Sequence, residues 1–201
     1  MNKALHRRFG GFLPVVVDCE TGGYDADKDA LLEVAAITLC YDAEAKLVTD
    51  KVMHFHVEPF AGAHISEESL EVTQIRPDHP FRFAVSEQDM LSALNVGIEE
   101  KLVSSGCRRA VLVGHNATFD LSFMRAAYAR CAMQRTNPFH RFTTFDTATM
   151  GGICFGETVL ARALRRAKIP FDLQEAHSAL YDAEKTAELF CKIINKLDKH
   201  Y

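Results

Sequence analysis

Long apolar runs, paired-cysteine spacings and secretion signals are all missing from this sequence, and each absence excludes a class of protein. No apolar stretch in the 201 residues approaches the ~20 residues that span a bilayer, so we expect no membrane association. Residues 1–10 are basic and polar with no long apolar segment after them, which is unlike a secretory signal. The six cysteines are scattered without CxxC spacing. We therefore predict a reduced, cytoplasmic protein without disulfides or structural zinc.

An excess of positive charge is also absent, because the formal net charge is −4. Any binding of nucleic acid must then depend on bound metal ions and local basic patches rather than on global charge. Repeats, low-complexity tracts and Gly/Ser linkers are missing too, and 48% of the residues are hydrophobic. We expect one globular domain over residues 1–201, with frayed ends at about 1–8 and 197–201.

The hydrophobic pattern indicates an α/β fold. Strands are predicted at about 13–19, 31–41, 49–58, 109–114 and 142–145. Helices are predicted at about 66–72, 86–104, 117–133, 157–168 and 178–198, with Ser86 as an N-cap and Gly106 as a stop. Three strands in succession, followed by alternating helices and strands, favour a central mixed five-stranded sheet with helices on both faces.

The most informative segment is Asp18-Cys19-Glu20, which ends the apolar run 13–17 and precedes Thr21-Gly22-Gly23. Residues two apart on a strand point to the same face, so Asp18 and Glu20 present two carboxylates side by side. Two adjacent carboxylates repel each other unless a cation lies between them. A hard divalent ion such as Mg²⁺ takes oxygen ligands and relieves that repulsion, although a solvated loop start would also account for the pair.

Further acids and a histidine fall at other element ends. Asp120 lies early in the helix that follows a buried strand, where ligands gather in an α/β sheet. His177 and Asp182 flank the start of the last helix, so they can converge on one site. Taken singly, Asp120 and Asp182 also suit ordinary helical acids, and His177 suits a hydrogen-bonded loop residue.

Taken together, four acids and one histidine at such ends predict a catalytic centre. Two divalent ions ~3.5–4 Å apart need about this number of carboxylates. An imidazole titrates near neutral pH and suits removal of a proton from an attacking water. The set therefore favours in-line hydrolysis of a phosphodiester, in which two cations stabilise the attacking and leaving oxygens.

Three segments carry a family resemblance: Asp18-Cys19-Glu20-Thr21-Gly22-Gly23, His115-Asn116-Ala117-Thr118-Phe119-Asp120, and His177-Ser178-Ala179-Leu180-Tyr181-Asp182-Ala183. They resemble the three exonuclease motifs of the DEDD superfamily, histidine subgroup. Supporting matches lie at 31–39, 54–60, 137–140 and 144–148, and the resemblance covers about residues 8–195. The tyrosine subgroup has a tyrosine four residues before the last aspartate, where this chain has Ser178.

The resemblance implies a ribonuclease H-like fold and a 3′-to-5′ exoribonuclease. Such an enzyme trims single-stranded 3′ ends of tRNA and other stable RNAs, also cuts single-stranded DNA, and releases nucleoside monophosphates. The implied cofactor is Mg²⁺, two ions per active site, for which Mn²⁺ can substitute. The implied metal ligands are Asp18, Glu20, Asp120 and Asp182, with Asp18 bridging both ions. The implied general base is His177.

The resemblance also implies contacts with substrate and a homodimer. The family stacks 3′-terminal bases on phenylalanines, a role matched here by Phe119, Phe142 and, as a tyrosine, Tyr24; Val72 stands at another such position. In the dimer, a basic patch of one subunit feeds RNA to the active site of the other. The matching basic residues are Arg7, Arg8, Arg108 and Arg109, whereas Gly10 and Val103 replace basic family positions.

Other functions remain open at this point. A proofreading exonuclease of a replicative polymerase and an oligoribonuclease share the three motifs, although the proofreading subunit usually carries a C-terminal extension. A catalytically dead nucleic-acid-binding module on the same fold is the alternative from another class, and the intact five-residue set argues against it. His54 and His56 share a strand face, but the sequence suggests no third ligand, so we interpret them as structural.

Overall fold

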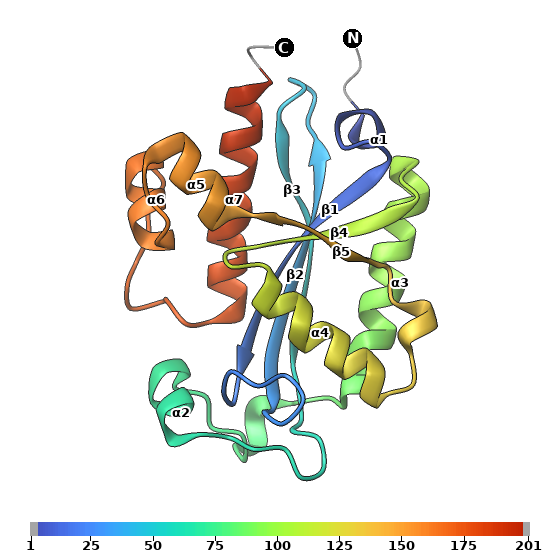
Figure 1. Cartoon of the computed structure of the whole chain (residues 1–201), viewed down its shortest axis with the longest axis vertical. Coiled ribbons are helices and arrows are strands. Elements are labelled where there is room, and N and C mark those ends of the chain that lie inside the picture. The colour runs from blue at the N-terminus through green and yellow to red at the C-terminus, as the bar shows by residue number, and fades with distance from the viewer. Residues whose placement is uncertain (1–3, 199–201) are drawn as a thin grey trace.

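A computed structural model describes residues 4–198 of the chain (Figure 1). It contains a five-stranded sheet in the order β3-β2-β1-β4-β5. The strands are β1 (Phe12–Thr21), β2 (Leu31–Tyr41), β3 (Leu47–His56), β4 (Arg109–Gly114) and β5 (Phe139–Asp146). β2 pairs antiparallel with β1 and β3, whereas β1, β4 and β5 run parallel. The prediction of a mixed five-stranded sheet is confirmed.

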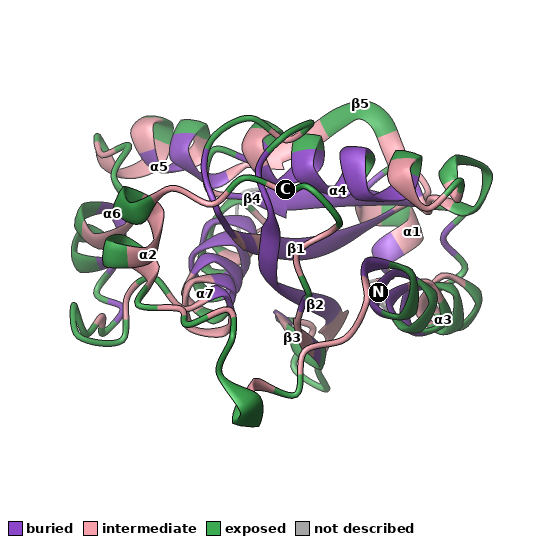
Figure 2. Ribbon diagram, turned by 90° about the horizontal axis from the view of Figure 1, so that it is seen from below, coloured by how far each residue is buried: buried purple, intermediate pink, exposed green. Residues whose placement is uncertain are grey.

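The centre of the sheet is buried on both faces, as Figure 2 shows. The run Leu13–Val17 of β1 is apolar and rich in β-branched valine, which favours a strand packed on two sides. α7 (Ala179–Leu197) contacts β1, β2 and β3, with α5 (Thr147–Phe155) and α6 (Leu160–Ala167) beside it. α3 (Glu87–Ser105) and α4 (Thr118–Arg130) pack against the other face.

The predicted helix boundaries follow from capping. Ser86 Oγ accepts a hydrogen bond from the Asp89 N–H and begins α3, and Gly106 ends it with a left-handed φ of 68°. Ser66 begins the short α2 (Glu67–Thr73) in the same way. None of the helices within residues 4–198 is both long and apolar enough to cross a membrane.

The helix α5 was not predicted, and several boundaries were wrong. α5 covers Thr147–Phe155, a segment with β-branched residues and two glycines that disfavour helix in isolation. Asp146 caps it by accepting from the Ala148 N–H. Gly151 is needed because a Cβ there would lie 2.7 Å from the Glu157 carbonyl oxygen. The helix predicted at 157–168 is accordingly shorter (α6), β5 is longer than 142–145, and β3 begins and ends two residues earlier than 49–58.

The described parts of the two chain ends contact each other. Leu5–Arg8 form a short helix, α1, and Arg8 Nε lies 2.6 Å from Asp198 Oδ1. For these residues the structure differs from the expected frayed ends, because an ion pair across the chain ends and the buried Leu5 hold α1 in place. The rest of that prediction, at 1–3 and 199–201, lies outside the described residues.

Candidate active site

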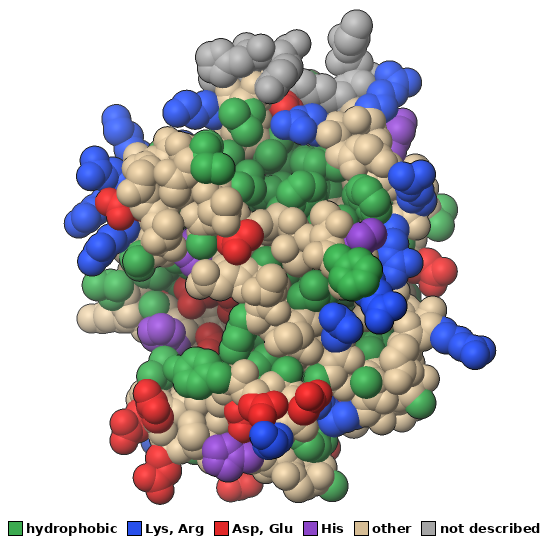
Figure 3. Space-filling view, in the orientation of Figure 1, with side chains coloured by type: hydrophobic (Ala, Val, Ile, Leu, Met, Phe, Trp, Pro, Cys, Tyr) green, Lys and Arg blue, Asp and Glu red, His purple; other side chains and the backbone are tan. Residues whose placement is uncertain are grey.

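Three of the predicted carboxylates converge at the end of β1. Asp18 and Glu20 are two residues apart on the strand, so their side chains point to the same face of the sheet. Asp182 comes from the first turn of α7. One oxygen from each of the three lies within 4.8 Å of the others. Figure 3 shows acidic side chains recessed in a hollow left of centre on this face of the molecule.

Asp120 reaches the same region from the start of α4. Its side chain is buried, and Oδ1 accepts a hydrogen bond of 3.0 Å from the backbone N–H of Cys19, between the two β1 acids. Asp120 lies outside the three-residue oxygen cluster, but its charge raises the pKa of Asp18, so the two groups are electrostatic neighbours. The fourth predicted acid is therefore adjacent to the cluster and ties α4 to β1.

Burial and mutual repulsion raise the pKa values of these acids. Burial, followed by the charges of Asp120 and Glu20, holds the pKa of Asp18 well above its usual range. Burial and the charges of Asp182 and Glu33 raise the pKa of Glu20 to about 8. Burial also raises the pKa of Asp120 to about 7. The folded chain thus holds several carboxylates in a site that penalises their negative charge.

The site fits a divalent cation. Asp182 Oδ1 is buried and has no hydrogen-bond partner, which is costly for a carboxylate oxygen unless an ion takes the place of the missing donor. Among residues 4–198, no Lys or Arg forms an ion pair with Asp18, Glu20, Asp120 or Asp182. The ligand atoms are all oxygens, the type that hard divalent cations prefer. A bound cation would supply the positive charge that this cluster lacks.

His177 stands at the edge of the cluster in the turn before α7. Its backbone N–H donates to Asp182 Oδ2 at 3.0 Å, and its φ of 69° is left-handed, which is uncommon for a residue with a side chain. Burial raises the pKa of Asp182, and this N–H and the nearby imidazole partly oppose that rise. The imidazole is exposed to solvent beside the acids, the position expected of a group that exchanges protons with water.

The glycines after the acids lie in a tightly packed loop. A Cβ on Gly23 would lie 2.1 Å from Asp29 Oδ2, so only glycine allows this approach. Asp29 is buried and accepts from the Asp25 N–H at 2.8 Å, and its other oxygen is 2.7 Å from His64 Nδ1. These bonds fix the loop of residues 22–30, which carries Tyr24.

The predicted stacking residues are only partly brought together. Tyr24 is 82% exposed, and its ring centroid is 6.4 Å from that of Phe119 at the start of α4. Phe119 also packs on Phe123, with ring centroids 4.9 Å apart, so it belongs both to the site and to the edge of the core. Phe142 is 74% exposed on β5 under the Arg141 guanidinium, and no ring contact within the described residues joins it to the pair. Val72 is exposed on α2.

The predicted basic residues lie at the opposite end of the sheet. Arg109 begins β4 and pairs in register with Phe12 at the start of β1, six to eight residues before the acids. At ~3.3 Å per residue, this separation is roughly 20 Å. Arg7 and Arg108 are exposed there, and Arg8 forms an ion pair with Asp198. The Arg109 guanidinium donates two hydrogen bonds to the Phe139 carbonyl oxygen.

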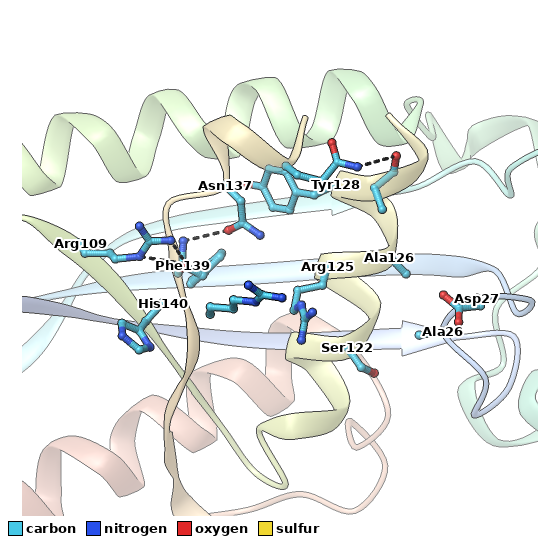
Figure 4. Close-up of a pocket in the computed structure, with 13 residues that line it drawn as sticks. Ala26, Asp27, Arg109, Ser122, Arg125, Ala126, Tyr128, Asn137, Phe139 and His140 are labelled. Atoms are coloured by element: carbon cyan, nitrogen blue, oxygen red, sulfur yellow. Dashed lines mark hydrogen bonds between the residues drawn. The ribbon is translucent and has the colours of Figure 1, made fainter. Parts of the chain in front are cut away.

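Sequence reasoning missed the basic pocket next to Arg109. Figure 4 shows this pocket between α4 and β5, with a volume of about 570 Å³. Arg109, Arg125, Arg141 and His140 contribute its basic lining. Arg125 and Arg141 come from two different elements and carry no local motif, so no sequence signal marked them.

A second cluster of possible metal ligands lies on the strands next to β1. His54 Nε2 is 2.6 Å from Glu33 Oε1, and the ligand atoms of Glu33, His54 and His56 lie within 4.8 Å of one another. Glu33 is therefore the third candidate ligand that the sequence did not suggest, and the interpretation of His54 and His56 as structural stays a prediction. Glu33 was missed because its place opposite Glu20 and His56 depends on strand register, which the sequence does not display.

A mixed sheet of this order, with acids from three elements at the strand ends, places the candidate site where ligands bind in α/β folds. The nuclease domain of 3′hExo, a DEDDh family member solved with rAMP, has a TM-score of 0.69 and 14% identity over 92% of each chain. E. coli exonuclease I in complex with a dT13 oligonucleotide also has a TM-score of 0.69, with 15% identity over 94% of this chain and 42% of that one. The fold prediction is confirmed.

The sequence comparisons are more specific. An exonuclease family model matches residues 15–190. Ribonuclease T from Vibrio parahaemolyticus serotype O3:K6 (strain RIMD 2210633) is 53% identical over 193 residues, which cover 96% of this chain and 90% of that protein. The chain belongs to the exonuclease family. The predicted relationship to the DEDD exonucleases is confirmed, as is the prediction of a 3′-to-5′ exoribonuclease of the hydrolase class.

Proposed function

We propose that this protein trims single-stranded 3′ ends of tRNA and other stable RNAs in the cytoplasm, as one exonuclease domain. It also degrades single-stranded DNA, and it releases nucleoside monophosphates. The observation that carries the proposal is the convergence of Asp18, Glu20 and Asp182, with one buried Asp182 oxygen unpartnered, in a chain 53% identical to ribonuclease T.

Asp18, Glu20, Asp120 and Asp182 are the proposed ligands of two Mg²⁺ ions, with Mn²⁺ as a substitute. When bound, the ions would polarise the scissile phosphate and neutralise charge that develops on its oxygens. The carboxylates repel each other without a cation, so their burial at one strand end prepares the site for such ions. The Cys19–Asp120 hydrogen bond keeps α4 at a constant position relative to the β1 acids.

His177 is the proposed general base. Its exposed imidazole lies beside Asp182, where it can accept a proton from the attacking water and pass that proton to solvent. The hydrogen bond from the His177 N–H to Asp182 orients the turn. It therefore holds the His177 imidazole at a defined position relative to the Asp182 carboxylate. The left-handed backbone at His177 is consistent with a residue held in place for function.

Tyr24 and Phe119 are the proposed platform for the terminal bases, with Phe142 as a further stacking residue. The rings of Tyr24 and Phe119 lie 6.4 Å apart, Phe119 directly precedes Asp120 in the sequence, and Tyr24 is 82% exposed. Every base has a π-face, so stacking of this kind holds a single strand without selecting its sequence. A duplex end cannot offer unpaired bases to such a platform, which favours single-stranded 3′ tails.

The basic residues are proposed to serve a homodimer. Arg7, Arg8, Arg108 and Arg109 lie roughly 20 Å from the acids of their own chain, too far to contact a nucleotide bound there. The pocket with Arg125 and Arg141 enlarges this basic surface. In a dimer, this surface of one subunit would contact RNA whose 3′ end lies in the partner's site.

The test uses a 5′-labelled RNA hairpin with a 3′ single-stranded tail, with and without Mg²⁺, on protein of measured oligomeric state. We expect stepwise shortening from the 3′ end up to the stem, release of nucleoside monophosphates, and no reaction in EDTA. Asp182→Asn is the matched control and should bind the tail without shortening it. A DNA hairpin of the same sequence gives the relative preference for RNA and DNA.

Three results would each replace the proposal with a different function. Preference for a mismatched DNA primer end would indicate a proofreading exonuclease. Hydrolysis confined to the shortest oligonucleotides would indicate an oligoribonuclease. Tail binding without hydrolysis in any divalent cation would indicate a nucleic-acid-binding module.

A further inference from the structure

α6 has two chemically opposite faces. Ala163, Leu164 and Ala167 are buried against Leu189 and Ile193 of α7. The other face carries three exposed arginines, the second and third of which lie three and four residues after the first, and an exposed lysine at the C-cap of the helix. These four cations are Arg162, Arg165, Arg166 and Lys168, and together they are called the α6 basic face. Figure 3 shows Lys and Arg side chains gathered along the left edge of the molecule.

Most of this positive charge is not neutralised. Arg166 Nε lies 3.5 Å from Glu157 Oε1. Within residues 4–198, no carboxylate oxygen lies within 4.0 Å of the charged nitrogens of Arg162, Arg165 or Lys168. Cations near a helix C-terminus are favoured by the helix dipole, which accounts for Arg165 and Arg166. The dipole does not account for Arg162, or for such a concentration of positive charge in a chain of net charge −4.

A groove of about 720 Å³ runs beside the α6 basic face. Its lining combines the cations Arg162, Arg165 and Lys168 with apolar residues that include Phe171 and Leu173. Leu173 is largely exposed. A groove that offers both cations and accessible apolar side chains suits a nucleotide strand, because phosphates pair with the cations and bases contact the apolar groups.

The groove is connected to the candidate active site. The Phe171 ring centroid is 5.4 Å from that of Tyr181, and the Asp172 N–H donates to the Tyr181 hydroxyl at 2.6 Å. Tyr181 directly precedes Asp182, and the loop after Phe171 continues to His177. Nucleic acid that leaves the acidic hollow toward α6 would therefore meet this groove next.

We propose that the α6 basic face binds the phosphate backbone of the RNA on the 5′ side of its 3′-terminal nucleotides. This inference rests on the proposed function, since it assumes that a 3′ end lies among the acids. The binding surface is separate from Arg7, Arg8, Arg108 and Arg109, which lie at the far end of the sheet. Guanidinium groups suit this role because they form paired hydrogen bonds with phosphate oxygens. The face lies beside the loop from Phe171 to His177, which leads into the candidate active site, and this position favours RNA over an acidic protein as the ligand.

The experiment measures RNA affinity in the variant R162Q/R165Q/K168Q. Arg166 is kept because it pairs with Glu157. Binding of a hairpin with a 3′ tail is measured in EDTA across a salt series. We expect at least a tenfold weaker affinity at moderate salt, and a salt slope reduced by about two to three phosphate contacts. Hydrolysis of a trinucleotide, which is too short to reach α6, should keep its wild-type rate.

The control variant R76Q/R135Q/K192Q removes three exposed cations elsewhere that also form no ion pair within the described residues, and it should bind like the wild type. Restoration of binding by R162K/R165K would show that positive charge suffices. A tail-only RNA of equal length tells whether the contacted phosphates belong to the single strand or to the stem.

Equal affinity and equal salt slope in R162Q/R165Q/K168Q and in the control would overturn this inference. Wild-type protein that neither binds nor shortens RNA would instead overturn the proposed function, so the two failures are distinguishable. A weaker affinity only for an acidic peptide, with RNA binding unchanged, would also reject the RNA assignment.

Discussion

The backbone N–H of Cys19 donates a hydrogen bond to Asp120 Oδ1 at 3.0 Å, across 101 positions of sequence. The bond joins the end of β1 to the first turn of α4 inside a cluster of buried acids. Asp120 satisfies a buried backbone group and at the same time adds charge to a site already rich in negative charge. The charge of Asp120 is therefore unfavourable for the stability of the metal-free protein, whereas a metal ligand needs that charge.

Asp120→Asn tests that conflict. The amide keeps an oxygen for the Cys19 N–H and removes the charge, so we expect the metal-free protein to gain stability at pH 8. The gain should be on the order of 1–3 kcal/mol, because the pKa of Asp120 is raised to about 7 and its ionised form is disfavoured there. Hydrolysis of a 3′ tail should be lost. Urea denaturation in EDTA and a tail-shortening assay give the two readouts, and a less stable variant at pH 8 would contradict the argument.

The stability of the metal-free protein should fall as pH rises. Burial raises the pKa of Glu20 from 4.5 to about 8 and that of Asp120 from 3.8 to about 7. The folded chain therefore holds protons that the unfolded chain has released. The stability that these protons provide is complete below about pH 4 and is lost as pH rises toward 8.

Melting temperatures in EDTA between pH 5 and pH 8.5 measure this dependence. Added Mg²⁺ should raise the melting temperature more at pH 8 than at pH 6, since the cation binds ionised carboxylates. The variant Asp18→Asn/Glu20→Gln should show a shallower slope in EDTA. A Mg²⁺ effect that does not depend on pH would mean that the acids do not bind the ion.

Much of the fold could be predicted because local signals and tertiary packing agree. The run before Asp18 is apolar and β-branched, and Ser86 and Gly106 mark the two ends of α3 as capping chemistry requires. The convergence of the acids could also be anticipated, because strand ends and helix starts meet at one edge of an α/β sheet. Local capping and hydrophobic patterns, together with the topology of the sheet, were enough to predict these features.

The remainder depends on contacts between distant segments. α5 contains two glycines, and its helix depends on the Asp146 cap and on the close approach of Gly151 to Glu157. Glu33 meets the histidine pair only through strand register. Arg125 and Arg141 meet across a pocket between α4 and β5. The Asp146 cap is a local signal that was missed, whereas the register of Glu33 and the meeting of Arg125 with Arg141 have no periodic or local signature in the sequence.

Gly23→Ala should disturb the loop that carries Tyr24. The new Cβ would lie 2.1 Å from Asp29 Oδ2, which must shift away from the Asp25 N–H. We expect a loss of roughly 1–3 kcal/mol of stability, typical of an overpacked site, together with a raised KM for a single-stranded tail. Combination with Asp29→Ala makes room for the methyl group. The double variant should then be no less stable than Asp29→Ala alone, and full additivity of the two losses would argue against a steric clash.

Tyr24 and Phe119 should differ when each is replaced by alanine. Tyr24 is 82% exposed, so Tyr24→Ala should weaken binding of a single-stranded tail by ~1–3 kcal/mol without lowering the melting temperature. Phe119 also packs on Phe123, so Phe119→Ala should weaken binding and lower stability together. Tyr24→Phe keeps the ring and should bind like the wild type. Unchanged tail affinity in Tyr24→Ala would remove this residue from the stacking platform.

His177→Ala should slow hydrolysis about 10²- to 10⁴-fold, the usual contribution of a positioned general base. Part of the loss should return as pH rises, because the attacking water then loses its proton more readily to solvent. The fold should be unaffected, since the bond to Asp182 comes from the His177 backbone and not from its ring. Rates from pH 6 to 9.5 in His177→Ala, with the wild type as reference, give the measurement. A deficit that stays constant across this range would count against a general-base role for His177.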